Sequence, residues 1–243
     1  MRVRSGTKSF ERVKELGEVF TPSSTVNSML DVLDEQLHKE TTELEYIKKT
    51  YLEPACGDGQ FLIAILERKL NAVNKLPLEL RQYGYIAALC SIYGIDIQND
   101  NVLESRERMC DVAAGNEVFT YDIDDKATSI QFVPNGFRIT DNMLKTFLYI
   151  INNNIICGDT LSKDNTDIMM FRYELNDKDK TISIFIDSLN SEDSNGLIAK
   201  PKEVVGENIP FDKLYTLKSL DYFINKANNK NLEQAVCDDD FDF

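Results

Sequence analysis

A glycine-rich turn near residue 57 is the feature that most constrains the fold of this chain. The turn is EPACGDG (residues 53–59), with the short β-like run 50–52 before it and a strongly apolar helical segment, 61–70, after it. Glycines let the backbone approach a ligand without Cβ clashes, and the following helix offers free N–H groups and the positive end of its dipole. The pattern predicts a strand–turn–helix unit able to bind a ligand, although a tight turn alone would also explain it.

Strand and helix signals alternate after this unit. Two more short strands are predicted over 93–97 and 154–159, and helices over 77–91, 99–114 and 142–151. The order strand–helix–strand–helix–strand is typical of an α/β fold with a parallel, doubly wound sheet. After the third core strand, the β-rich runs 169–175 and 181–187 predict an antiparallel hairpin. Residues 188–210 have the composition of a loop, and 211–227 predict a final helix or two helical turns.

Changes in composition divide the chain into four parts. Residues 1–16 form a basic arm, 17–187 one α/β domain, 188–230 a C-terminal loop and helix, and 231–243 an acidic tail that we expect to be disordered. The plainer interpretation of the two charged ends is that both are solvated. Within the domain, Thr21 or Ser23 is expected to cap a helix. Its apolar stripe is Val26, Met29, Leu30, Leu33 and Leu37. Residues 115–141 give no clear pattern and resemble an insertion.

Composition excludes several classes of protein. The net charge of -14 argues against strong sequence-independent binding to nucleic acid, which needs clustered Lys and Arg. Five scattered cysteines, no C-x-x-C pair and a single histidine argue against disulfides and against a metal site, and they fit a reducing cytoplasm. No apolar run of 18 residues and no secretory signal is present, so we expect a cytoplasmic protein with no membrane segment.

Four motifs occur in a fixed order along the chain. They are GEVFTP (17–22), LEPACGDGQFL (52–62), YGIDI (93–97) and IICGDTL (155–161). This set resembles the adenine-N6-specific DNA methyltransferases of restriction–modification systems and phages, over about two thirds of the chain. The resemblance implies a Rossmann-like methyltransferase fold with S-adenosyl-L-methionine as the cofactor.

The resemblance also implies roles for matching residues. Phe20, Thr21 and Pro22 would close over the methionine part of the cofactor. Its amino-acid end would be held by Glu53 and by the turn residues Ala55, Cys56, Gly57, Asp58 and Gly59, with Phe61 following in the same motif. From the residues alone, Phe20 and Phe61 could equally be core aromatics.

The adenosine end of the cofactor has its own set of matching residues. Asp96 would bind the ribose hydroxyls and Ile97 would pack on the adenine ring. Asp159 would accept a hydrogen bond from the adenine amino group, with Leu161 beside the ring. Plainer interpretations stay open, because Asp96 could cap a helix and 158–159 could be an ordinary turn at a strand end.

The family's signature tetrapeptide, NPPY or DPPY after the Gly-Asp motif, is missing. It binds the amino group of the target adenine and stacks an aromatic ring on the flipped base. No proline lies between Asp159 and Lys200, and the nearest substitute is DSLN (187–190). Asp187 is therefore only a weak candidate for a catalytic residue.

Three functions are compatible with these features. We favour an S-adenosylmethionine-binding member of the family that is catalytically impaired, a pseudoenzyme, and acts with a protein partner that supplies base or target recognition. The first alternative is an active DNA adenine-N6 methyltransferase with a divergent motif. The second is a non-enzymatic acidic protein that binds a DNA-acting enzyme. In each case we expect the isolated chain to bind DNA weakly at most.

Overall fold

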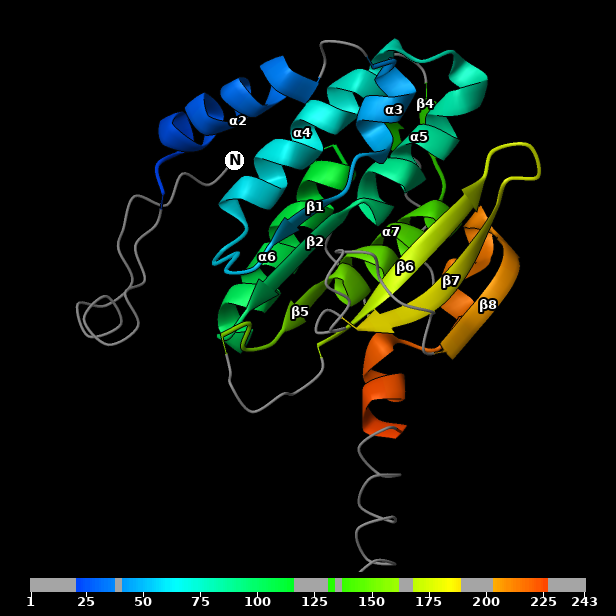
Figure 1. Cartoon of the computed structure of the whole chain (residues 1–243). Helices are drawn as coiled ribbons and strands as arrows, with labels where there is room; N and C mark the ends of the chain where they lie inside the picture. The colour runs from blue at the N-terminus through cyan, green and yellow to red at the C-terminus, as the bar shows by residue number, and fades with distance from the viewer. Residues whose placement is uncertain are drawn as a thin grey trace, which may run out of the picture.

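A three-stranded parallel sheet forms the centre of the computed structural model, which describes residues 21–37, 41–115, 131–133, 137–161, 168–188 and 203–226. Its strands are β1 (Tyr51–Glu53), β2 (Ile92–Asp96) and β5 (Ile155–Cys157), in the order β1-β2-β5 (Figure 1). Leu52 lies opposite Tyr93, and Ile95 lies opposite Ile156. The α/β class and the parallel strands predicted from the sequence are confirmed.

Helices cover this sheet and supply most of the core. Helix α4 (Gln60–Lys75) packs against α6 (Asn99–Ala113), and both contact β2; α5 (Leu78–Cys90) and α7 (Asp141–Asn154) form a second contacting pair that also meets β2. In α4, apolar residues recur at helical spacing, and Leu62, Leu66 and Val73 are fully buried. Helices α2 (Ser23–Leu37) and α3 (Glu43–Lys48) pack on α4. No helix among the described residues is long and apolar enough to cross a membrane.

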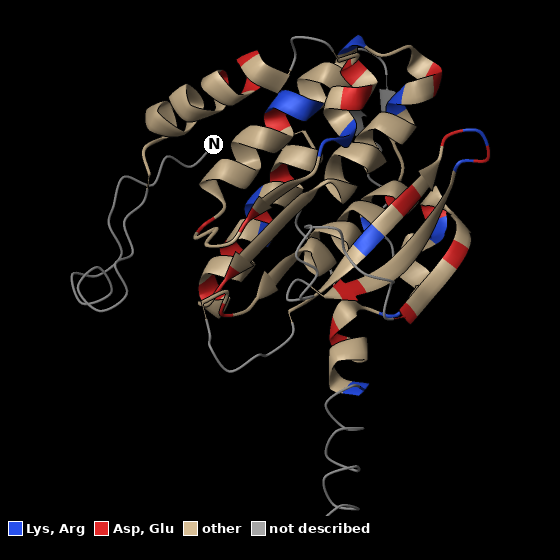
Figure 2. Cartoon of the chain, in the orientation of Figure 1, with Lys and Arg blue, Asp and Glu red and all other residues tan. Residues whose placement is uncertain are grey.

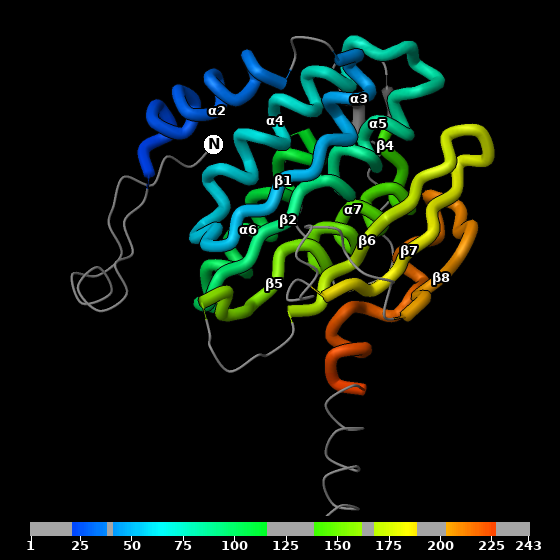
Figure 3. Tube along the Cα trace, viewed as in Figure 1, coloured from blue at the N-terminus to red at the C-terminus, as the bar shows by residue number. Residues whose placement is uncertain are grey.

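The predicted hairpin is present and belongs to a second, antiparallel sheet. Strands β6 (Met169–Asn176) and β7 (Thr181–Ser188) pair along their whole length, and β8 (Glu203–Pro210) joins the other edge of β7 (Figure 3). The prediction of a loop over 188–210 was therefore wrong for β8. This strand is mostly exposed and pairs with a register shift, so its sequence, EVVGENIP, lacks the alternation that marks a half-buried strand. Two helical turns follow, η1 (Phe211–Thr216) and 220–226, as expected.

The predicted apolar stripe of the helix after Pro22 needs correction, and the predictions for the two ends of the chain lie outside the described residues. The helix after Pro22 is present as α2, but only Val26 and Leu30 of its expected stripe are buried, whereas Met29 and Leu33 are 56% and 41% exposed. A single helical turn separates Val26 from Leu30, so α2 contacts α4 along a narrow line. The insertion holds an antiparallel pair, β3 (Gln131–Val133) and β4 (Phe137–Ile139). The arm 1–16 and the tail 231–243 lie outside the described residues.

Lys69 on α4 is fully buried and holds the amino ends of the parallel strands. Its Nζ donates to the carbonyl of Ile47 at 2.7 Å, to the carbonyl of Lys49 at 2.5 Å and to the hydroxyl of Ser91 at 2.6 Å. Burial lowers the pKa of Lys69 to about 7. The three acceptors favour the charged amine. Lys69 thereby ties the end of α3 and the residues just before β1 and β2 into one unit.

Substitution of Lys69 by methionine should destabilise the protein. Lys69→Met keeps the length of the side chain but leaves buried acceptors without a donor, which costs roughly 1–3 kcal/mol of unfolding free energy. Urea denaturation measures this change. Lys75→Met is the matched control, because Lys75 lies on the same helix, its side chain is 61% exposed and it pairs only with Glu43 among the described residues. A Lys69→Met protein no less stable than the control would contradict the anchoring role.

Candidate cofactor site

The glycine-rich turn joins β1 to α4 and is shaped by two residues with positive φ. Gly57 has φ +53° and Gly59 has φ +82°, a left-handed backbone that favours glycine. A Cβ on Gly59 would lie 2.5 Å from the Oγ of Ser105 on α6, whereas a Cβ on Gly57 would meet no atom within 4 Å. Gly59 is therefore required by helix packing, and the space beside Gly57 is open to a ligand.

Asp96, at the carboxyl end of β2, fixes the turn in place. Its Oδ2 accepts a hydrogen bond from the N–H of Gly57 at 2.8 Å. Its Oδ1 accepts from the N–H of Gln98 at 2.8 Å and from the Nδ2 of Asn101 at 3.1 Å. The bond to Gln98 lies just before α6, so the plainer interpretation, a cap for this helix, describes part of its role. A carboxylate has about four acceptor positions, so about one is left for a ligand donor.

One face of α6 binds the turn through side-chain contacts. Asn101, Ser105 and Arg108 follow each other at helical spacing, and each reaches the turn or Asp96. Ser105 donates to the carbonyl of Gly57 at 3.1 Å. Arg108 pairs with the carboxylate of Asp58 at 2.5 Å and donates to its carbonyl at 2.7 Å. The sequence analysis did not identify these three residues as part of the site. Their helical spacing, which places three polar side chains on one face of α6, was the signal that could have indicated it.

The end of β5 closes the arrangement from the other side. The N–H of Gly158 donates to the carbonyl of Asp96 at 3.0 Å, and the hydroxyl of Thr160 donates to the carbonyl of Pro54 at 3.1 Å. Asp159 is exposed, and its Oδ1 accepts from the N–H of Leu161 at 2.9 Å, which is the geometry of a local turn. Hydrogen bonds to backbone carbonyls thus join the ends of all three strands.

Acidic and apolar side chains gather at this end of the sheet. Four acidic residues lie at or just beyond the strand ends: Glu53, Asp58, Asp96 and Asp159. Figure 2 shows acidic segments of the ribbon at this end of the sheet. Burial raises the pKa of Glu53, and a hydrogen bond from the backbone of Ala55 opposes that shift. Ile97 and Leu161 are 57% and 89% exposed and offer apolar contact beside the carboxylates. Among the described residues, no group of three or more His, Cys, Asp or Glu side chains is placed to hold a metal ion.

The other predicted cofactor residues are placed less favourably. Cys56 is buried next to Ser105, and burial raises the pKa of its thiol to about 12, so it is a packing residue. Phe61 is half-buried against the core, in line with the plainer interpretation. No described contact brings Thr21 or Pro22 to the turn; the carbonyl of Pro22 starts α2 instead. Phe20 lies outside the described residues.

Comparison with protein-family models, curated proteins and solved structures found no match to this chain. The resemblance to adenine-N6 methyltransferases therefore stays a prediction that depends on the four motifs and on the geometry around the glycine-rich turn.

Asp187, the weak catalytic candidate, lies at the end of β7 in the antiparallel sheet. It is 3% exposed, and its Oδ2 pairs with the Nε of Arg172 at 2.8 Å. Its Oδ1 has no hydrogen-bond partner among the described residues. The guanidinium of Arg172 also lies over the ring of Phe185, 4.6 Å from its centroid. These contacts are those of a buried ion pair within the sheet, and no described bond links Asp187 to the three strand ends.

Gly59→Ala should destabilise the protein more than Gly57→Ala. Both variants force alanine into a left-handed backbone at roughly 1–3 kcal/mol, but only the first also clashes with Ser105. Overpacking of this kind costs about 1 kcal/mol or more, measurable by urea denaturation. Ser105→Ala should cost less in the Gly59→Ala background than in the native chain. Equal costs for the two glycine variants would show that the contact with α6 does not constrain the turn.

Proposed function

We propose that this chain binds S-adenosyl-L-methionine at the carboxyl ends of β1, β2 and β5. The observation that carries the proposal is the charge around the glycine-rich turn. Such a turn, followed by a helix N-terminus, suits either the pyrophosphate of a dinucleotide or an amino-acid-bearing nucleoside. Among the described residues, four carboxylates lie at this end of the sheet, and one guanidinium, that of Arg108, pairs with one of them. Carboxylates repel a pyrophosphate, whereas they attract the sulfonium and ammonium groups of S-adenosylmethionine.

Each part of the cofactor has a matching group at this site. Glu53 receives the ammonium of the methionine end, and the open space beside Gly57 admits the chain that follows it. The acceptor position left on Asp96 takes a ribose hydroxyl. Ile97 and Leu161 pack on the adenine ring, and Asp159 accepts from its amino group. A carboxylate that accepts from hydroxyl and amino donors is ordinary hydrogen-bond chemistry.

The strand order supports a Rossmann-like methyltransferase fold. In a doubly wound sheet the first three strands lie side by side in sequence order, and ligands bind beyond their carboxyl ends. β1, β2 and β5 have this order, with helices between them in the sequence. We assign them as one half of such a sheet.

Within the DNA adenine-N6 methyltransferase family, we place this chain as an impaired member that acts with a partner. The chain has no proline between Asp159 and Lys200, so the stiff turn that holds a flipped adenine is missing. The weak substitute, Asp187, is buried in an ion pair with Arg172. The net charge of -14 also disfavours approach to a DNA duplex. A partner would then supply the contacts to the base.

Calorimetric titration with S-adenosylmethionine should give a dissociation constant of millimolar or tighter. Asp96→Asn should weaken binding about ten- to hundredfold, because a hydrogen bond to a charged group is worth roughly 1.5–3 kcal/mol. Because Asp96 also holds the turn, Leu161→Ser tests the ring contact without cost to the fold, and about a tenfold loss is expected. Leu78→Ser is the control, since Leu78 is 55% exposed on α5. If the native chain does not bind, the proposal is wrong.

Transfer of a labelled methyl group to mixed-sequence DNA should be slow or absent with the purified chain alone. Holding an adenine out of the stack costs a few kcal/mol, and no described side chain at the site offers a stacking ring to offset this cost. Rapid transfer that is lost in Asp58→Ala would show an active enzyme with a divergent motif. Cofactor binding without transfer would support the impaired member, and the absence of both would favour the non-enzymatic alternative.

A further inference from the structure

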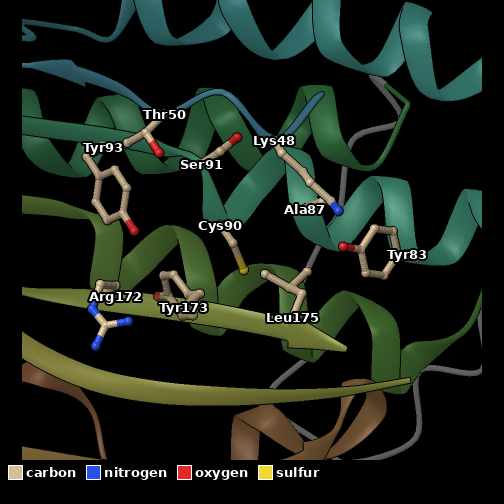
Figure 4. A pocket seen from close by; sticks show the side chains of 10 residues that line it. All are labelled: Lys48, Thr50, Tyr83, Ala87, Cys90, Ser91, Tyr93, Arg172, Tyr173 and Leu175. Carbon is tan, nitrogen blue, oxygen red and sulfur yellow. The ribbon is translucent and has the colours of Figure 1, made fainter. Parts of the chain in front are cut away.

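A cavity lies at the amino ends of β1 and β2, the end of the sheet opposite the proposed cofactor site. Its volume is about 240 Å³, and its wall is formed by α3, α5, β2 and β6 (Figure 4). Tyr93 on this wall precedes Asp96 by three residues in an extended strand, a separation of roughly 10 Å. The cavity is therefore separate from the site at the strand ends.

Two tyrosines that line the cavity have hydroxyl groups that bond to no described residue. Tyr83 is 1% exposed and Tyr93 is 8% exposed, yet neither hydroxyl makes a hydrogen bond within the described part of the chain. In Figure 4 the hydroxyl of Tyr83 lies at one end of the cavity, near the amine of Lys48. The hydroxyl of Tyr93 points toward Arg172 at the other end. A buried tyrosine hydroxyl normally has a partner, because its desolvation is costly. Each end of the cavity thus offers an unused donor.

The Tyr83 end carries positive charge that forms no ion pair among the described residues. The amine of Lys48 lies 5.1 Å from the centroid of the Tyr83 ring, and that of Lys180 lies 5.9 Å from it. Neither lysine forms an ion pair in the described residues, and Lys180 donates only to the backbone carbonyl of Glu79 at 3.5 Å. At the opposite end, Arg172 is already paired with Asp187 and Glu174. An anion would therefore be held at Tyr83.

The middle of the cavity is apolar. It is lined by Ala87, Cys90 and Leu175, and complete burial raises the pKa of the Cys90 thiol well above its ordinary value, so the thiol is neutral. The hydroxyl of Tyr173, which also faces this region, already donates to the Oδ1 of Asn154 at 2.7 Å. A ligand would meet charge and a hydroxyl at one end, apolar surface in the middle and a hydroxyl donor at the other.

We propose that this cavity binds a small carboxylic acid with a single ring or short chain and a second oxygen at its far end. The carboxylate lies at Lys48 and Tyr83, the apolar body lies over Cys90 and Leu175, and the far oxygen accepts from Tyr93. The volume lies below the roughly 300–1,000 Å³ of sites for drug-sized ligands, which limits the ligand to this size. A carboxylate ligand carries a single negative charge, which suits two lysines and a phenol. A phosphate ligand is more often bound by an arginine fork or by a helix N-terminus.

The probe that tests this proposal is 4-acetylbenzoate, titrated into the full chain by saturation-transfer NMR and calorimetry. Binding is expected, and 4-acetylbenzamide, which lacks the charge, should bind at least about tenfold more weakly. Lys48→Met and Tyr83→Phe should weaken binding of the carboxylate. Tyr93→Phe should weaken binding of 4-acetylbenzoate but leave 4-isopropylbenzoate, which has no far acceptor, unchanged.

The controls are Lys178→Met, an exposed lysine of the β6–β7 turn, and Tyr215→Phe, whose hydroxyl bonds Asn142 away from the cavity. Both should bind the probe like the native chain. Without ligand, Tyr83→Phe and Tyr93→Phe should leave the unfolding midpoint nearly unchanged, because neither hydroxyl bonds to a described residue and both face the cavity. No binding at millimolar probe, or equal binding by Lys48→Met, overturns the proposal. Because these readouts need no S-adenosylmethionine, they are independent of the proposed function.

Discussion

The carboxylate of Asp96 is the contact on which the geometry of the candidate cofactor site depends. An ionised group that is 8% exposed must be surrounded by donors, because a buried charge without partners is very unfavourable. Its donors come from the turn, from the residue before α6 and from α6 itself: Gly57, Gln98 and Asn101. The three segments are thereby fixed relative to one another before any ligand binds. A ligand over β2 would meet a preorganised turn rather than a loop that it must order.

Local signals explain which parts of this arrangement could be predicted from the sequence. The parallel strands, the turn at Gly57 and Gly59 and the β6–β7 hairpin all have marks within a few residues: short apolar runs, glycines and a polar turn. Local signals could not predict the ion pair between Asp58 and Arg108. These residues are fifty positions apart, and only the packing of α6 against the turn brings them together. β8 shows another limit. Its backbone pairs with β7 while its side chains stay exposed, so burial leaves no pattern in its sequence.

The two ends of the short parallel sheet have opposite chemical character. Carboxylates gather where β1, β2 and β5 end, whereas the buried amine of Lys69 and several phenols gather where β1 and β2 begin. Lys69 explains part of this polarity, since its three acceptors include carbonyls at the end of α3, where a cation is stabilised. β2 is buried along its whole length and carries both Tyr93 and Asp96. A strand packed on all sides keeps its two ends at a fixed separation.

The position of β1 bears on the proposal that this chain acts with a partner. In a complete doubly wound sheet the strand order reverses beside the first strand, and the crevice at that point is where ligands bind. Among the described strands, β1 pairs with β2 alone, so its other edge has no strand to continue the sheet. The second antiparallel sheet does not fill this position, because β6, β7 and β8 pair only with one another in the described part of the chain. A cofactor bound over the turn would then have protein on the β2 side of the crevice and no sheet strand on the other. Under the proposed function, a second polypeptide would supply both the contacts of the missing tetrapeptide and the structure beside the edge of β1 that no described strand pairs with.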